Sequence, residues 1–317
     1  MSGRIERLRF GTRGSKLALW QTRHVVGLLG TRRPEIAVDE VLISTLGDRV
    51  TDVPLFRVGG QGLFVAEIER ALQERRIDVA VHSLKDLPHA MAEGLCLAAV
   101  TTREDARDVL VSRNGTTLAD LPAGARIGTS SLRRRAQLMR LRPDLAFVDC
   151  RGNLDTRLRK LDAGEFDAIV LAAAGLRRLG WADRITEWFD PPALIPAAGQ
   201  GMLGIQCRSD DLALIELLED TLDDPLASHC AAAERGFLHR LQGGCQTPMG
   251  VHATHADDET LRLTAFVALP DGSKYLKTDL SGPANYAADL GCLAAEDLLE
   301  KGAASLLAAP PDPGLTP

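Results

Sequence analysis

Aromatic residues, an excess of positive charge and paired cysteines are scarce or missing in this 317-residue chain. Aromatic side chains make up only 4% of the residues, which argues against a stacking platform for nucleic-acid bases. The formal net charge is −6, so the molecule as a whole is not built to bind a polyanion. We therefore expect no nucleic-acid partner.

Long apolar runs are also missing, since none reaches the roughly 18 residues that a membrane-spanning helix needs. The opening sequence, MSGRIERLRF, lacks the apolar core of a signal peptide. We expect a cytoplasmic protein with no membrane partner and, because no large apolar patch is evident, a monomer. The chain is too long to fold around a single hydrophobic core of ordinary size, so its length predicts two or three domains.

The cysteines are spread along the chain without forming a CxxC pair, and a cytosolic chain of this size does not need disulfides. Five lie in apolar or helix-like sequence and are expected to be buried and inert: Cys96, Cys150, Cys207, Cys230 and Cys292. Cys245 differs, because it follows two glycines in LHRLQGGCQTPMG. A nucleophile, a redox thiol, an attachment point for a cofactor and an incidental loop cysteine all remain open for it.

The order of apolar patterns predicts an α/β protein with two domains that resemble periplasmic binding proteins, each with a mainly parallel sheet and helices on both faces. We expect the first to comprise residues 1–101 and 200–220, with a Pro/Gly-rich return segment, and the second residues 102–199. Within the second, FDAIVLAAAGL is interpreted as one strand. Residues 221–317 are expected to form a small α+β domain with a three-stranded antiparallel sheet, a hairpin at PDGS and a disordered tail.

Arginines and hydroxyl side chains recur where strands give way to helices. Two of these three junctions lie in the stretch Arg126–Lys160, which holds ten Lys/Arg and three Asp/Glu. Free N–H groups at helix starts and guanidinium groups both attract anions. Each junction alone is better explained as a solvated helix face with capping serines, but three together favour a pocket for a small anion, because carboxyl ends of parallel strands share one crevice. The residues concerned are Arg13 and Ser15 in GTRGSKLAL, Thr129, Ser130, Ser131, Arg133 and Arg134 in GTSSLRRRAQL, and Arg151 and Arg157 in RGNLDTRL.

The stretch VAVHSLKDLPHAM places Lys85 and Asp86 at the end of an apolar strand. An ionised Asp86 can stabilise a developing cation or pass a proton. An aspartate that caps the turn before Pro88 explains the sequence equally well. The pair His252 and His255 lies on a strand-like run with the two side chains on opposite faces, so we expect no metal site.

Taken together and in order, these motifs resemble the porphobilinogen deaminase family, also called hydroxymethylbilane synthase. The likeness runs through TRGSKLAL, VGGQGLF, AVHSLKDLP, GTSSLRRRAQL, RGNLDTRLRKLDAGEFDAIVLAAAGLRRLG, PAAGQG and LQGGCQTPMG, which span nearly the whole chain. The resemblance implies a transferase of tetrapyrrole biosynthesis that joins four porphobilinogen molecules head to tail with loss of ammonia. It also implies a covalent dipyrromethane cofactor, held through a thioether to Cys245.

The resemblance further implies a role for each matching residue. Asp86 is the implied catalytic residue, a buried carboxylate that stabilises the cationic azafulvene formed when ammonia leaves. Implied cofactor-binding residues besides Cys245 are Lys85, Thr129, Ser130, Ser131, Arg133, Arg134 and Arg157. Implied substrate-binding residues are Arg13, Ser15, Arg151 and Arg178.

Two positions depart from the family pattern. Gln61 stands where the Gly-rich loop often has lysine, with Arg57 as a substitute charge, and Lys16 stands where many relatives have proline. A different class, a non-catalytic two-lobed anion-binding protein, would also use paired α/β domains, but it has no use for a third domain that carries Cys245.

Overall fold

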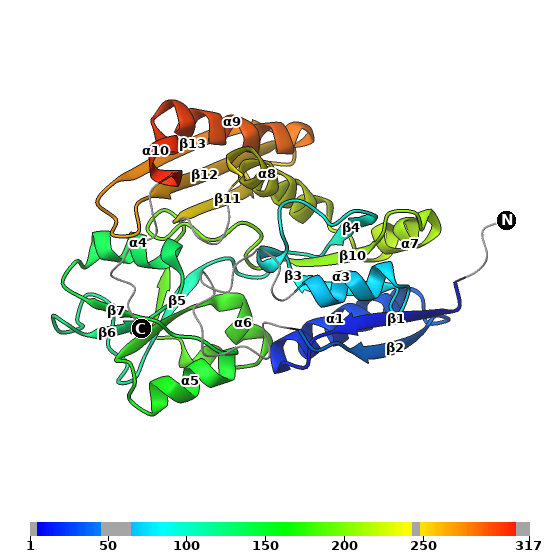
Figure 1. The fold of residues 1–317 in the computed structure, drawn as a ribbon, viewed down its shortest axis with the longest axis horizontal. Coiled ribbons are helices and arrows are strands. Elements are labelled where there is room, and N and C mark those ends of the chain that lie inside the picture. Colours follow the sequence, from blue (N-terminus) through cyan, green and yellow to red (C-terminus); the bar gives the residue numbers. More distant parts are fainter. Residues whose placement is uncertain (1–4, 46–64, 243–247, 309–317) are drawn as a thin grey trace. The chain divides into compact units, whose positions relative to one another are not determined.

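The computed structural model describes residues 5–45, 65–242 and 248–308 (Figure 1). These residues form two compact units, which we call unit 1 (described residues up to 104, and 201–228) and unit 2 (105–200 and the described residues from 229 onward). The three-domain division expected from the sequence remains a prediction, in which unit 2 would contain two domains. Within the described residues, no helix has both the length and the apolarity needed to cross a membrane.

Unit 1 is built on a five-stranded sheet with the strand order β2-β1-β3-β10-β4. Its strands are β1 (Arg7–Thr12), β2 (Ala37–Leu42), β3 (Val79–Ser83), β4 (Leu95–Val100) and β10 (Leu203–Arg208). Its helices are α1 (Lys16–Arg32), α3 (Ala66–Gln73) and α7 (Leu212–Leu222), with a 3-10 turn η1 (Leu84–Asp86). Four strands are parallel to one another, and β10, which arrives from a distant part of the sequence, runs antiparallel to β3 and β4.

Both faces of this sheet are covered, and β3 accordingly begins with the apolar run Val79–Val81 and is buried at four of its five positions. Val79 and Val81 point to a core that contains residues of α1 and α7, whereas Ala80 points to the opposite core with residues of α3. The sequence-based prediction of helices on both faces is therefore confirmed for unit 1.

Residues 105–200 of unit 2 form a second five-stranded sheet of the same plan, with the order β7-β6-β8-β5-β9. Its strands are β5 (Asp108–Ser112), β6 (Arg126–Gly128), β7 (Ala146–Val148), β8 (Ala168–Ala172) and β9 (Glu187–Phe189). Its helices are α4 (Leu132–Leu141), α5 (Leu154–Asp162) and α6 (Ala173–Arg178), with the 3-10 turn η2 (Ala182–Arg184). Here β5 is the antiparallel strand, paired with both β8 and β9, so the mainly parallel sheet is again confirmed.

One element of this sheet corrects the sequence analysis. The run FDAIVLAAAGL, interpreted as a single strand, divides into β8 and the helix α6, which begins at Ala173. The branched residues Ile169 and Val170 stay in the strand, and the alanines that follow favour a helix once the chain leaves the sheet.

The remainder of unit 2 is an antiparallel sheet in the order β11-β12-β13, as predicted. Its elements are β11 (Met249–His255), β12 (Thr260–Ala268), β13 (Tyr275–Pro283), η3 (Ala284–Tyr286), α9 (Ala287–Glu300) and α10 (Ala303–Leu307), and α8 (Pro225–Leu241) precedes them. The loop at PDGS closes the hairpin between β12 and β13, with Gly272 at a positive φ of 72°. The tail beyond residue 308, predicted to be disordered, lies outside the described residues.

This antiparallel sheet packs directly on α4 and on the segment before residue 200. Phe266 and Ala268 of β12 share a small core with Ala136 of α4 and with Ile195. A fully buried carboxylate, Glu234 of α8, accepts hydrogen bonds from the backbone N–H groups of Gly199 (2.6 Å) and Ala253 (2.8 Å). Unit 2 is therefore held together by both an apolar contact and a buried polar one.

Candidate active site

The carboxyl-terminal edge of the unit 1 sheet carries four of the residues predicted from the sequence. The parallel strands β1 and β3 end at Thr12 and Ser83, and the chain then continues into the predicted residues. Arg13 and Ser15 follow β1, and Lys85 and Asp86 lie on η1 directly after β3. Because parallel neighbours end at the same side of a sheet, the topology brings these four residues to one edge, as predicted.

Asp86 is exposed, which corrects the expectation of a buried carboxylate. In η1, Leu84 is the side chain that enters the core, and the carboxylate two residues later turns away from it. Asp86 forms no hydrogen bond or ion pair with any residue that the structure describes. Its carboxylate therefore does not cap the turn before Pro88 and is open to a ligand.

The histidine behind this turn is buried and neutral. His82 is hydrogen-bonded through Nε2 to Oε1 of Gln206 at 2.9 Å. Burial lowers the pKa of His82 to about 4, and the positive charge of Arg13 acts in the same direction, against the hydrogen bond to Gln206. This places Arg13 close enough to His82 for their charges to interact, while leaving His82 without a charge near neutral pH.

Ser15 is a capping serine, which is the structural alternative to anion binding at this junction. It is the N-cap of α1, and its Oγ accepts a hydrogen bond from the backbone N–H of Ala18 at 3.3 Å. The amide of Gln21, one turn further along α1, donates to Ser83 Oγ at 2.9 Å. Together these bonds fix the start of α1 against the end of β3, and thereby the backbone that carries Arg13.

The three hydroxyl residues after β6 are likewise used to shape the loop. Thr129 Oγ1 accepts from the N–H of Ser131 (3.2 Å), and Ser131 Oγ accepts from the N–H of Arg134 (3.4 Å) as the N-cap of α4. Ser130 Oγ donates to the carbonyl of Cys150 (3.1 Å) and accepts from its N–H (3.2 Å). The loop after β6 is thus tied to the loop after β7.

Arg133 and Arg134 are buried rather than open at the start of α4. Only 7% of Arg133 and 6% of Arg134 is exposed, and both guanidinium groups contact the fully buried carboxylate of Asp108. Arg133 Nη1 lies 2.6 Å from Asp108 Oδ2, and Arg134 Nη2 lies 2.7 Å from Asp108 Oδ1. The sequence analysis did not identify Asp108; its only signal was a short apolar strand, DVLVS, after a charged stretch.

The remaining predicted arginines of unit 2 lie in or after loops at the same sheet edge. Arg157 of α5 donates through Nε to the carbonyl of Gly152 at 2.9 Å. Arg178 is the last residue of α6, which follows β8. Nη1 of Arg151, in the loop after β7, is buried without a hydrogen-bond partner among the described residues. A buried guanidinium nitrogen without an acceptor is costly, and a bound anion would satisfy it.

Three residues of interest cannot be placed in this way. Cys245 lies outside the described residues, as do Gln61 and Arg57 of the Gly-rich loop. Among the other cysteines, Cys150, Cys207 and Cys230 are buried, and Cys96 and Cys292 are partly buried, in agreement with their interpretation as structural thiols.

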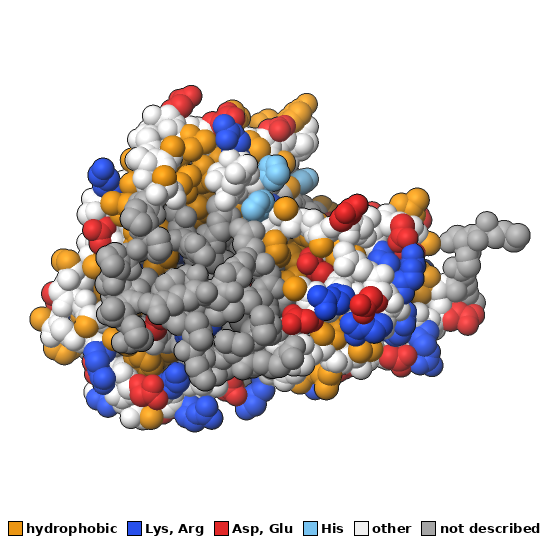
Figure 2. All heavy atoms as spheres, viewed as in Figure 1, with side chains coloured by type: hydrophobic (Ala, Val, Ile, Leu, Met, Phe, Trp, Pro, Cys, Tyr) orange, Lys and Arg blue, Asp and Glu red, His pale blue; other side chains and the backbone are white. Residues whose placement is uncertain are grey.

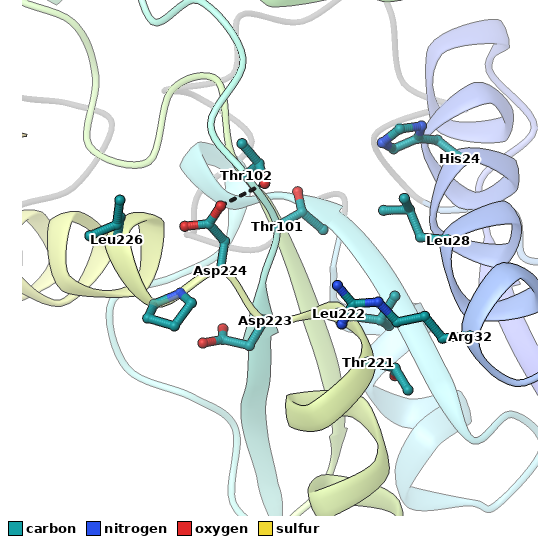
Figure 3. Close-up of a pocket in the computed structure, with 11 residues that line it drawn as sticks. His24, Leu28, Arg32, Thr101, Thr102, Thr221, Leu222, Asp223, Asp224 and Leu226 are labelled. Carbon is teal, nitrogen blue, oxygen red and sulfur yellow. Dashed lines mark hydrogen bonds between the residues drawn. The ribbon is translucent and has the colours of Figure 1, made fainter.

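A cavity of about 610 Å³ in unit 1 contains none of the predicted residues (Figure 3). It is lined by α1, by the residues after β4 and by the link between α7 and α8. Its two carboxylates are already engaged: Asp223 accepts from the N–H of Val100, and Asp224 accepts from Thr102 Oγ1 at 2.6 Å. We assign the cavity to the junction of these elements rather than to the active site.

Charged residues elsewhere on unit 1 are intermixed, as Figure 2 shows over the part of the surface where α3 lies. Several form exposed pairs, such as Arg75 with Asp210 (2.7 Å) and Arg76 with Glu74 (2.8 Å). Such pairs contribute little to stability and leave no broad basic face in this region.

The donor set at the sheet edge of unit 2 fits a ligand with several carboxylates. Arg151 offers a buried nitrogen without an acceptor, and the pair Arg133 and Arg134 carries two positive charges against the single negative charge of Asp108. The dipyrromethane cofactor that the sequence resemblance implies bears carboxylate side chains, and these guanidinium groups would suit them.

Comparison with known proteins identifies the family of this chain. The family model described as "Porphobilinogen deaminase, dipyromethane cofactor binding domain" matches residues 8–216, and "Porphobilinogen deaminase, C-terminal domain" matches residues 228–300. Porphobilinogen deaminase of Geobacter metallireducens is 51% identical over 306 residues, covering 96% of this chain and 94% of the relative. That of Chromobacterium violaceum is 49% identical over 305 residues, covering 96% and 98%.

Among solved structures, this chain is similar to a BvgS VFT2 domain of Bordetella pertussis, with 15% sequence identity and a TM-score of 0.42. The match covers 68% of this chain and 86% of that domain, and it is too distant to support a conclusion. The two family models and the relatives, by contrast, extend over nearly the whole chain. The chain belongs to the porphobilinogen deaminase family.

Proposed function

We propose that this chain condenses four porphobilinogen molecules head to tail, with loss of one ammonia per unit, and releases the linear tetrapyrrole hydroxymethylbilane. The observation that carries the proposal is the exposed carboxylate of Asp86 on η1, directly after the central strand β3. It has no hydrogen bond or ion pair with the residues that the structure describes, and the chain matches the family over residues 8–216 and 228–300. The proposed setting is the cytoplasm, and the proposed working form is a monomer.

The cofactor proposed is a dipyrromethane joined through a thioether to Cys245. When bound, this group supplies the primer to which pyrrole units are added. The residues proposed to hold its carboxylates are Lys85, Arg133, Arg134 and Arg157, with Thr129, Ser130 and Ser131 shaping the loop. Those proposed to hold the incoming substrate are Arg13, Ser15, Arg151 and Arg178.

The role proposed for Asp86 follows from charge. Loss of ammonia from porphobilinogen leaves an electrophile that is cationic when protonated, and a nearby carboxylate lowers the free energy of that cation. The same carboxylate can hold a proton released from a pyrrole carbon or nitrogen. The neutral imidazole of His82 behind η1 adds no positive charge that would oppose this effect.

The first test uses the purified protein with porphobilinogen. Wild-type protein is expected to carry a dipyrrole adduct in its intact mass, to release ammonia and to form a linear tetrapyrrole. Asp86→Asn is expected to fold and keep the adduct but to lose turnover about 10²–10⁴-fold, the range for a removed acid–base group. Asp210→Asn, which removes an exposed carboxylate on the surface of the same unit, serves as the matched control and keeps turnover.

Cys245→Ser tests the attachment point in the same mass measurement, and it is expected to show no stable adduct. A non-catalytic anion-binding protein would bind porphobilinogen without releasing ammonia, and that result would refute the proposal. Wild-type turnover in Asp86→Asn would refute only the role of that residue.

A further inference from the structure

Asp108 is a fully buried carboxylate that the predicted active site does not include. It is the first residue of β5, the one antiparallel strand in its sheet. In the register of that pairing, Asp108 lies opposite Ala172, the last residue of β8. The antiparallel direction of β5 thus delivers Asp108 to the same edge at which β6 and β8 end and α4 begins.

Three side chains from two separate segments converge on this carboxylate. Arg133 Nη1 donates to Oδ2 at 2.6 Å, and Arg134 donates to Oδ1 through Nε (3.0 Å) and Nη2 (2.7 Å). The amide of Gln200 adds a further bond to Oδ1 at 3.0 Å and also donates to the carbonyl of Ala106 at 2.7 Å. The motifs GTSSLRRRAQL and PAAGQG are therefore joined through Asp108.

The two arginines are held in different ways. Arg134 uses all three guanidinium nitrogens within the protein, because its Nη1 donates to the carbonyl of Val170 at 2.9 Å. Arg133 makes both of its contacts through Nη1, which also donates to the carbonyl of Ile195 at 2.7 Å. Its Nε and Nη2 have no hydrogen-bond partner among the residues that the structure describes.

The charges of the cluster do not cancel. Burial raises the pKa of Asp108, but the charges of Arg133 and Arg134 outweigh burial and hold that pKa well below its usual range. Burial lowers the pKa of Arg133, and the like charge of Arg134 acts in the same direction, against Asp108. One carboxylate thus faces two guanidinium groups, and an excess positive charge in a buried setting is stabilised by one further anion.

We infer that Asp108 is a positioning residue, which orients Arg133 and Arg134 so that Nε and Nη2 of Arg133 face a carboxylate of the bound dipyrromethane. This inference rests on the proposed function. Asp108 itself does not touch the ligand; it acts through the two guanidinium groups, and Gln200 adds a third donor to Oδ1, which also accepts from Arg134. With Asp108 in place the cluster accepts one anionic group; without it, the two arginines repel each other and lose a common orientation.

The test compares Asp108→Asn with Asp78→Asn. Asp78 in unit 1 is a matched control, because it also accepts hydrogen bonds from two arginines: Arg9 Nη2 at 2.8 Å and Arg208 Nη2 at 3.1 Å. Both variants lose stability in thermal unfolding. We expect Asp108→Asn to retain the dipyrrole adduct in at most about a tenth of the molecules, as judged by intact mass after incubation with porphobilinogen, because a charge-assisted bidentate contact is lost. Asp78→Asn is expected to retain it fully.

Asp108→Glu covers the case in which the asparagine variant does not fold. It keeps the negative charge but moves the carboxylate by one methylene, so it is expected to fold, to hold the adduct and to show a KM for porphobilinogen raised about tenfold with a smaller change in kcat. A purely structural role would lower the unfolding midpoint and leave KM unchanged.

Three results would each overturn the inference. They are full adduct occupancy in Asp108→Asn, an unchanged KM in Asp108→Glu, and a loss of adduct in Asp78→Asn equal to that in Asp108→Asn at a similar unfolding midpoint. A wild-type protein without adduct or ammonia release would instead refute the proposed function, and the role of Asp108 with it.

Discussion

Replacement of His82 by glutamine is expected to remove an acid-sensitive contribution to the stability of the fold. Gln206 fixes the state of this imidazole, because its Nε2 donates to Glu69 at 2.9 Å and its Oε1 therefore faces His82. His82 must then donate from Nε2 and carry no proton on Nδ1. Protonation at low pH would put an uncompensated positive charge inside the sheet, near Arg13.

The size of the effect follows from the pKa. The ordinary value of 6.5 is lowered to about 4 in the folded protein, mainly by burial, a difference that corresponds to about 3 kcal/mol. Because the unfolded chain binds the proton more readily, this stability is fully present above the unfolded pKa. It is lost as the pH falls from 6.5 to about 4, and no further loss from His82 follows below that.

The assay is urea unfolding at several values from about pH 7.5 to about pH 4.5, for wild type and for His82→Gln. The carboxylates contribute equally to both proteins, so the change in their difference over this range isolates His82. We expect the wild type to lose about 2–3 kcal/mol more than the variant. His239→Gln, at an exposed position of α8, serves as the control and should follow the wild type. Parallel loss in wild type and His82→Gln would refute the reasoning.

Two further predictions concern unit 2. Glu234→Gln places an amide NH₂ group where a buried carboxylate accepts hydrogen bonds from the N–H groups of Gly199 and Ala253. We expect this substitution to lower the free energy of unfolding by about 1–3 kcal/mol, which thermal unfolding measures. An unchanged unfolding midpoint would contradict this prediction. Gly291→Ala puts a methyl group against the carbonyl oxygen of Ala233, so α8 and α9 must separate at a cost of about 1–3 kcal/mol. Its control is Gly27→Ala on α1, where no atom lies within 4 Å of the new methyl group and stability is expected to rise by about 0.5–1 kcal/mol. Equal effects at the two glycines would rule out the close contact between α8 and α9.

Much of the fold could be predicted because its periodic patterns are local. The apolar run Val79–Val81 at the start of β3 indicates a strand buried on both faces, and Ser15 before Lys16 indicates a helix start. Both elements are present. The same local patterns predicted that Arg13 and Asp86 each follow a strand, and the pairing of β1 with β3 makes those strands neighbours. They could not predict that Asp86 is exposed, because exposure depends on how η1 turns after the strand, with Leu84 taking the place in the core.

The segment around Asp108 shows what local patterns cannot reveal. In REDARDVLV it is one of several charged residues before a short apolar run, and nothing nearby distinguishes it from a solvated aspartate. Its burial is decided by β5 running antiparallel between β8 and β9, and by arginines 25 and 26 positions later in the chain. Only the paired strands reveal the partner of Arg133 and Arg134.

The arginines in GTSSLRRRAQL can be interpreted as a buried structural contact or as a receptor for an anion. These two interpretations are compatible. A structural ion pair alone would need one guanidinium group for one carboxylate, whereas here two share Asp108 and one of them keeps two nitrogens without a hydrogen-bond acceptor among the described residues. An anion receptor alone would not need Arg134 bonded through all three nitrogens. Both requirements are met if Asp108 holds Arg134 rigidly and also orients Arg133, whose other two nitrogens can donate to an anion. Guanidinium groups that are oriented in advance lose less conformational entropy when a carboxylate binds.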